Sequence, residues 1–189
     1  MPSSLHYHIT DVVSLIQFFH PRSVLDVGCG FGRWGFLARE YCDIIAERYE
    51  RSSWLTRIDA VEVFPAYICD HHRYIYNNIY ISRIEDCLAR LPQYDVIIAG
   101  EILEHIEKER SLETLKALRQ KATRALICSV PLGEDWPQGE TLGNPHEAHV
   151  SQWTADELRA LGAGFLKTYE CGESEYAVAV WSRIPIKVK

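Results

Sequence analysis

Hydrophobic and polar positions alternate along the chain with two different periods. Short apolar runs predict buried strands within residues 23–28, 56–64, 78–84, 94–100 and 124–132. Apolar residues spaced by three or four predict helices within residues 9–19, 34–49, 65–76, 84–91, 101–122 and 151–162. Residues 165–183 predict two more strands around the turn at 171–174, which is typical of an antiparallel hairpin.

Strands that alternate with helices predict an α/β fold with a doubly wound, mostly parallel sheet and a C-terminal antiparallel hairpin. The 189 residues contain no internal repeat, low-complexity tract or linker, so we expect one domain spanning residues 1–189. In such sheets, ligands bind beyond the carboxyl ends of the strands. Candidate chemistry is therefore expected at these ends.

Composition narrows the class of protein. The six cysteines are scattered without a CxxC pair, which is typical of reduced, packed thiols. The net charge of −6 argues against broad nucleic-acid binding or an anionic membrane surface. No apolar run approaches the roughly 20 residues that span a bilayer, and we expect a cytoplasmic protein without a membrane anchor. Nothing in the sequence indicates the oligomeric state.

The segment Gly133–Val150 is long for a connection and dense in Gly, Pro and Asn. Segments of this kind are usually functional or mobile. We predict that it forms a lid over the ligand pocket and brings His146 and His149 to it.

A glycine-rich turn lies within "VLDVGCGFGRWGFLARE", between the first strand and the second helix. Gly28, Gly30 and Gly32 allow the backbone to approach a ligand closely, and the following helix presents its positive end. Gly30, Gly32 and Gly35 also satisfy GxGxxG, so a nicotinamide or flavin cofactor stays an alternative at this point.

Two carboxylates refine the choice of ligand. Glu62 ends the second strand, where an acid can accept both hydrogen bonds of a ribose diol. Asp26 precedes the glycines, and a carboxylate there suits a ligand with an ammonium and a sulfonium better than a pyrophosphate. Together, Asp26 and Glu62 favour a ligand that contains an adenosine and carries positive charge.

At these positions the chain resembles the class I S-adenosylmethionine-dependent methyltransferases. The matching motifs are "LDVGCGFG", "VEVF", "YDVIIAGEILEHI" and "ICSVPLG", and the resemblance spans residues 24–181. It implies a Rossmann-like, seven-stranded sheet that binds S-adenosylmethionine. It also implies roles for particular residues: Asp26, Gly28 and Gly30 at the methionine and ribose end, Glu62 on the ribose hydroxyls, Val63 on the adenine face, and the Gly100 carbonyl on the methionine amino group.

One position departs from the family pattern. Arg83 stands where many relatives place an aspartate for the adenine amino group. The backbone amide of Ile84 can still serve the adenine ring. In place of that aspartate, the acceptor for the adenine amino group could be Glu85, Asp86, a backbone carbonyl or water.

Methyl transfer to a hydroxyl needs alignment and removal of a proton. Glu101, Glu104 and His105 have helical spacing i, i+3 and i+4, so we expect them on one helix face. Glu101, His105 and His149 are the catalytic candidates. "GEILEH" followed by "HVSQWT" is similar to small-RNA 2′-O-methyltransferases of plants and bacteria, and its first half to ubiquinone-pathway O-methyltransferases. This likeness implies a divalent cation (Mg²⁺, Mn²⁺ or Zn²⁺) on Glu101, Glu104, His105 and His149, with His146 as a spare ligand.

The sequence thus favours a methyltransferase that acts on a small molecule, most readily at oxygen. Catalysis by His105 without a metal is an alternative at the same site. Two other functions stay open: a module that binds S-adenosylmethionine without catalysis, and a nucleotide-dependent oxidoreductase that uses the overlapping GxGxxG motif.

Overall fold

The computed structural model of the chain describes residues 5–134, 136–141 and 143–186. Seven strands form one sheet in the order β3-β2-β1-β4-β5-β7-β6. β1 to β5 run parallel, and β7 pairs antiparallel with both β5 and β6. The predicted fold class, including the C-terminal hairpin, is confirmed. The strands are β1 Ser23–Val27, β2 Arg57–Glu62, β3 Asn78–Ile81, β4 Tyr94–Gly100, β5 Ala122–Leu132, β6 Phe165–Cys171 and β7 Ser174–Ser182.

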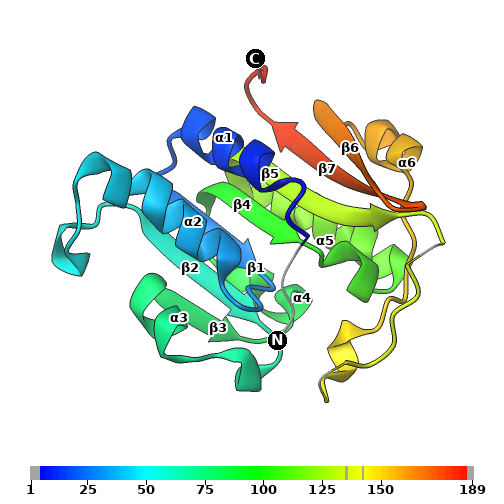
Figure 1. The fold of residues 1–189 in the computed structure, drawn as a ribbon, viewed down its shortest axis with the longest axis horizontal. Coiled ribbons are helices and arrows are strands. Elements are labelled where there is room, and N and C mark those ends of the chain that lie inside the picture. Colours follow the sequence, from blue (N-terminus) through cyan, green and yellow to red (C-terminus); the bar gives the residue numbers. More distant parts are fainter. Residues whose placement is uncertain (1–4, 135, 142, 187–189) are drawn as a thin grey trace.

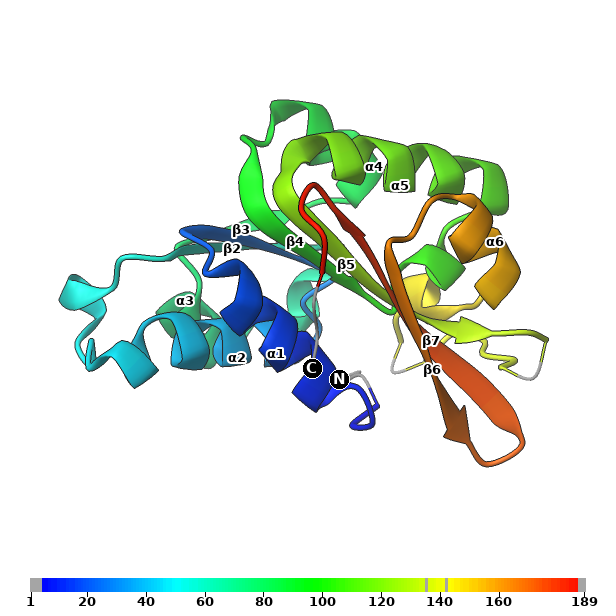
Figure 2. The ribbon, with the colours of Figure 1, turned by 90° about the horizontal axis from the view of Figure 1, so that it is seen from above.

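Helices cover both faces of the sheet (Figures 1 and 2). One face carries α1 Ile9–Phe19, α2 Arg33–Cys42 and α3 Asp70–Ile75. The other carries α4 Ile84–Cys87, α5 Lys108–Lys121 and α6 Ala155–Ala160. Short 3₁₀ turns lie at η1 Ile44–Ala46, η2 Arg51–Ser53, η3 Pro65–Tyr67, η4 Leu88–Arg90, η5 Leu103–His105 and η6 Pro145–Glu147. None of the helices within the described residues is both long and apolar enough to cross a membrane.

The core has two apolar layers because neighbouring strand residues point to opposite faces of the sheet. Val24 belongs to the same buried cluster as Ile16 of α1 on one face, and Leu25 belongs to the same cluster as Leu118 of α5 on the other. All four side chains are at most 1% exposed. The continuous apolar runs in the sequence therefore reflect strands buried on both sides.

On the face that carries α2 and α3, two predicted helices are shorter than expected. The helix predicted over 34–49 ends at Cys42, because the buried carboxylate of Asp43 accepts hydrogen bonds from the Leu55 amide and the Arg48 side chain and turns the chain there. The pattern at 65–76 gives η3 and a six-residue α3 instead of one helix. A capping box begins α6: the Glu157 amide donates to the Thr154 hydroxyl, and the Thr154 amide donates to the Glu157 carboxylate.

Candidate functional site

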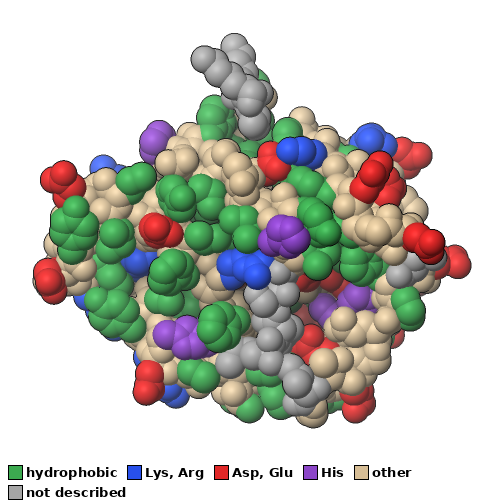
Figure 3. Space-filling model, viewed as in Figure 1, with side chains coloured by type: hydrophobic (Ala, Val, Ile, Leu, Met, Phe, Trp, Pro, Cys, Tyr) green, Lys and Arg blue, Asp and Glu red, His purple; other side chains and the backbone are tan. Residues whose placement is uncertain are grey.

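A cavity of about 410 Å³ lies at the carboxyl ends of β1, β2 and β4. The loop between β1 and α2 forms one wall, and residues of the predicted lid, including Trp136, Asn144 and His149, form another. Figure 3 shows histidine and acidic side chains together in the hollow beside the segment that follows β5. The predicted position of the site is therefore the one where the structure has a cavity.

The glycine loop owes its shape to left-handed backbone. Gly28, Gly30 and Gly32 have φ of +69°, +51° and +88°, a region that residues with a Cβ rarely occupy. A Cβ on Gly28 would also lie 1.9 Å from Cδ1 of Ile102. The Gly28 amide donates to the Val61 carbonyl at 2.8 Å, which ties the loop to the end of β2. Both Gly28 and Gly30 line the cavity.

Asp26 lies beneath this loop, and the cavity wall does not include it. Its Oδ2 accepts the Gly35 amide at 3.0 Å and the Tyr76 hydroxyl at 2.6 Å. The side chain is fully buried, and burial raises the pKa of Asp26 to about 6. Contrary to the expectation that it lines the ligand pocket, the carboxylate supports the loop and the start of α2 from behind.

Glu62 and Val63 line the cavity at the end of β2. The Glu62 carboxylate accepts the Phe64 amide at 2.9 Å on one oxygen and the Gly30 amide at 3.0 Å on the other. Burial raises the pKa of Glu62, while these amide hydrogen bonds oppose the rise. The two amides fix the orientation of the carboxylate at the position predicted for the ribose.

The next wall of the cavity contains Arg83, Ile84 and Glu85. Ile84 begins α4, and the first amides of a helix have no partner within it. Oε1 of Glu85 is buried without a hydrogen bond from the described residues, 3.7 Å from nitrogens of Arg83 and Arg110. Of the two acids considered as substitutes for the missing aspartate, Glu85 borders the cavity, and Asp86 is exposed outside it.

Gly100 ends β4 and lines the cavity, as expected. A Cβ at this position would lie 2.5 Å from Nε1 of Trp34, a residue of α2. That indole nitrogen is buried and has no hydrogen-bond partner among the described residues. The glycine at position 100 is therefore required by the close approach of Trp34.

Glu101 follows β4 with φ +56°, which is uncommon for a residue with a Cβ. Its Oε1 accepts the Tyr176 hydroxyl at 2.5 Å and the Leu5 amide at 3.2 Å. It lines the cavity but does not share a helix face with Glu104 and His105. The prediction of one helix over residues 101–122 is wrong here, because the Leu103 carbonyl accepts the hydroxyls of Ser111 and Ser151 and α5 begins only at Lys108.

Glu104, His105 and His149 come together across the cavity. One ligand atom from each lies within 4.8 Å of the others, and this group of described residues does not include Glu101 or His146. The Glu104 side chain is 1% exposed, and neither carboxylate oxygen has a hydrogen-bond partner among the described residues. Burial therefore raises the pKa of Glu104 well above its ordinary value. A buried carboxylate without partners is costly unless a cation or a proton neutralises it.

Hydrogen bonds set the tautomers of the two histidines. Nδ1 of His105 lies 3.1 Å from the Ala148 carbonyl, and Nδ1 of His149 lies 2.7 Å from the Trp136 carbonyl. A carbonyl only accepts, so each Nδ1 carries the proton, and each Nε2 keeps a lone pair when the ring is neutral. Burial lowers the pKa of His105 to about 4, which keeps that ring neutral at pH 7. This is the arrangement in which a histidine binds a metal or accepts a proton.

Glu147 is a cavity residue that sequence reasoning missed. Its Oε1 accepts the Tyr67 hydroxyl and the Asn144 side-chain amide, each at 3.0 Å. The Tyr67 contact joins positions 80 residues apart and holds the predicted lid against the β2 side of the cavity. The signal in the sequence was its place between His146 and His149 in an irregular segment.

Comparisons with known proteins agree with this fold. Residues 4–165 match the family model described as "Methyltransferase domain". No curated protein sequence matches the chain. Many solved structures are similar to the chain, including the following three, which match along most of their lengths.

The first similar structure is a SAM dependent methyltransferase from Archaeoglobus fulgidus, with 18% identity and TM-score 0.62, covering 90% of this chain and 91% of that one. The N-terminal domain of EvdMO1, determined with SAH and D-fucose, has 14% identity, TM-score 0.64 and coverages of 95% and 84%. Magnesium protoporphyrin IX methyltransferase from Synechocystis PCC 6803, with bound SAH, has 13% identity, TM-score 0.62 and coverages of 97% and 90%. At these identities the likeness concerns the fold.

Proposed function

Because the chain belongs to the methyltransferase domain family and is an S-adenosylmethionine-dependent methyltransferase, we propose that it methylates a hydroxyl group of a small-molecule acceptor. We place the reaction where Glu104, His105 and His149 meet. The observation that supports the proposal is the buried Glu104 carboxylate, which has no hydrogen-bond partner among the described residues and lies beside two imidazoles whose Nε2 atoms keep a lone pair.

These three side chains fit a divalent cation. One carboxylate and two neutral imidazoles are a common ligand set for Zn²⁺ or Mn²⁺, and each histidine is oriented by a backbone carbonyl. A cation bound there would lower the pKa of an acceptor hydroxyl. Glu101 belonged to the predicted ligand set but lies outside this group, with its Oε1 already accepting two hydrogen bonds. We therefore assign it to the cavity wall.

The alternative without a metal uses His105 as the base. Its Nε2 has a lone pair, but burial lowers the pKa of the ring to about 4, which makes it a weak proton acceptor at pH 7. This favours a role for His105 as a ligand or in orienting the acceptor.

We place S-adenosylmethionine along the glycine loop. Glu62 would bind the ribose hydroxyls, Val63 and Ile84 would border the adenine, and the Gly100 carbonyl would accept from the methionine amino group. Glu85 is the proposed acceptor for the adenine amino group, because it borders the cavity and its Oε1, 3.7 Å from nitrogens of Arg83 and Arg110, accepts no hydrogen bond from the described residues.

The charge of the cavity supports a small, uncharged or cationic acceptor. Among the described residues that line it, five are glutamates and two are arginines. A polyanion such as nucleic acid would meet unfavourable charge there. A structural relative was determined with D-fucose, a small hydroxylated molecule, which is compatible with this class of acceptor.

The first experiment separates the classes of function. The protein is titrated by calorimetry with S-adenosylmethionine, SAH and NAD, and then incubated with methyl-labelled S-adenosylmethionine and a pool of hydroxylated metabolites. We expect SAH binding, no NAD binding, and label transfer to an alkali-stable ether. Binding without transfer to any acceptor would favour the non-catalytic module, and NAD binding alone would favour an oxidoreductase.

The second experiment tests the cation site. Chelator-treated protein is titrated with Mn²⁺, followed by electron paramagnetic resonance of the free ion. We expect saturable binding in the wild type that Glu104→Gln abolishes. Glu101→Gln is the matched control, since it removes a nearby carboxylate outside the group. Equal Mn²⁺ binding by wild type and Glu104→Gln would exclude the assigned ligands.

A further inference from the structure

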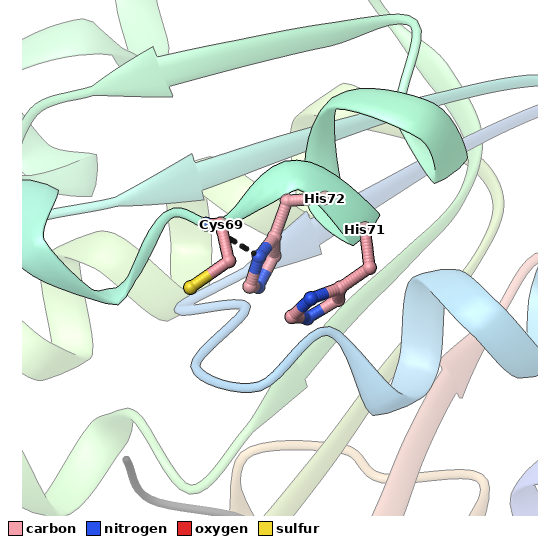
Figure 4. A group of neighbouring side chains, drawn as sticks. All are labelled: Cys69, His71 and His72. Atoms are coloured by element: carbon pink, nitrogen blue, oxygen red, sulfur yellow. Dashed lines mark hydrogen bonds between the residues drawn. The ribbon is translucent and has the colours of Figure 1, made fainter.

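Two neighbouring histidines of α3 contact the glycine loop. In Figure 4 the side chains of His71 and His72 point from this helix toward the loop that leads into α2. Nε2 of His72 lies 2.9 Å from the Gly30 carbonyl oxygen, and Nε2 of His71 lies 3.0 Å from that of Phe31. Because carbonyls only accept, each imidazole donates from Nε2. Two successive carbonyls of the loop are thus held from one short helix.

His72 is held more firmly than His71. Its other nitrogen, Nδ1, accepts the Cys69 amide at 3.1 Å, which belongs to the capping box of α3. The ring is fully buried and stacks on Tyr76 at 6.1 Å. A Cβ on Gly32 would lie 3.2 Å from the ring, so the loop packs closely against it. Burial also lowers the pKa of His72, which favours the neutral ring that these hydrogen bonds require.

The same contacts argue against a metal on this helix. Ligand atoms of Cys69, His71 and His72 lie within 4.8 Å of one another. However, a neutral imidazole has one lone pair, and that of His72 already accepts the Cys69 amide. The rings of the two histidines are tilted against each other, with centroids 4.1 Å apart and planes 35° apart. The group is explained by helix capping and by its bonds to the loop.

Gly30 is consequently fixed from two sides. Its carbonyl accepts from His72 of α3, and its amide donates to Glu62 at the end of β2. We infer that His72 is a positioning residue for S-adenosylmethionine: it holds the Gly30 peptide in the orientation that leaves the loop open to the ligand. The inference rests on the proposed placement of the cofactor along this loop. Without the bond, part of the binding free energy would be spent on ordering the loop.

Two variants, each of which keeps one hydrogen-bonding atom of the imidazole, separate the positioning of Gly30 from the capping of α3. His72→Asn places an amide oxygen near the position of Nδ1, so it keeps the acceptor for Cys69 and loses the donor to Gly30. His72→Gln places an amide nitrogen near the position of Nε2, so it keeps the donor and loses the acceptor. If His72 served only to cap α3, His72→Gln would lower stability and SAH affinity more than His72→Asn.

SAH affinity is measured by calorimetry and stability by urea unfolding for the wild type and both variants. We expect Asn to bind SAH about threefold to tenfold more weakly, the effect of one lost hydrogen bond, and Gln to stay within about twofold of the wild type. Unchanged affinity in Asn, or a larger loss in Gln, would overturn the inference. A wild type that does not bind SAH would instead refute the cofactor placement.

Nitrogen-15 NMR of the wild-type histidines keeps the test independent of how the variants fold. We expect His72 as the tautomer protonated at Nε2, with slow exchange of that proton, and a change in its signal on adding SAH. Protonation at Nδ1 would contradict the assignment. Saturable Zn²⁺ binding that Cys69→Ser abolishes would also overturn it, because the metal would replace the capping hydrogen bond.

Discussion

Replacing Glu62 by glutamine tests the ribose site most directly. In the free protein the carboxylate accepts two backbone amides, from Gly30 and Phe64. Glutamine keeps one of these acceptors and presents an amide group to the other donor, at a loss of about 1 kcal/mol. Removing a charge whose pKa is raised by burial offsets part of that loss. We therefore expect the unfolding free energy of the free protein to change by no more than about 1 kcal/mol.

Cofactor binding responds differently to the same change. A ribose diol donates two charge-assisted hydrogen bonds to a carboxylate, and an amide offers one neutral acceptor in its place. We expect a loss of about 1.5–3 kcal/mol, which is about a tenfold to 150-fold weaker Kd for SAH. Isothermal calorimetry gives the Kd, and urea unfolding gives the stability.

Glu147→Gln is the matched control. Glu147 also lines the cavity, but both of its hydrogen bonds go to Oε1, so glutamine can keep the Tyr67 and Asn144 contacts. Its SAH affinity should stay within about threefold of the wild type. An unchanged Kd in Glu62→Gln, or an equal loss in both variants, would refute the ribose assignment.

Three further predictions concern Asp26, Gly35 and the segment predicted to form a lid. The pKa of Asp26 is raised to about 6 in the folded protein, so its contribution to stability is present below about pH 4 and is lost as pH rises to about 6. Across that window, urea unfolding should show the wild type losing on the order of 2–3 kcal/mol of unfolding free energy relative to Asp26→Asn. Parallel stability curves for the two proteins would contradict the burial of this carboxylate. Gly35→Ala puts a Cβ 2.2 Å from the buried ring of Tyr76, so we expect about 1–3 kcal/mol of destabilisation, whereas Gly139→Ala, with no atom within 4 Å, should unfold like the wild type. Residues 136–141 and 143–150 should exchange amide hydrogens more slowly with SAH than without it, and identical exchange would indicate a fixed loop; residues 135 and 142 of the predicted lid lie outside the described residues.

Much of the fold could be predicted from local sequence patterns. The β2 strand was predicted within residues 56–64 and is found at Arg57–Glu62, and the terminal hairpin was predicted with its turn at residues 171–174. These elements follow from periodicity and turn chemistry, which a short window of sequence contains. The glycine spacing likewise indicated the loop at the cavity, since left-handed backbone requires glycine wherever it occurs.

The remaining features depend on contacts between distant segments. The helix predicted over residues 101–122 starts late because Ser151, 48 residues beyond Leu103, donates to the Leu103 carbonyl. Glu104 and His149 meet only because the segment that contains His149 folds back onto the cavity.

By itself, the sequence determined the order of strands and helices, the glycine loop and the family of enzyme to which they belong. Tertiary structure decided which carboxylates are buried and which nitrogen of His105 and of His149 keeps a lone pair. It also decided that Asp26 supports the loop and that Glu104 has no hydrogen-bond partner among the described residues. Periodicity is a property of neighbouring residues and can be found in the sequence. Desolvation and hydrogen-bond pairing depend on what the folded chain brings to each group, and only the complete fold determines them.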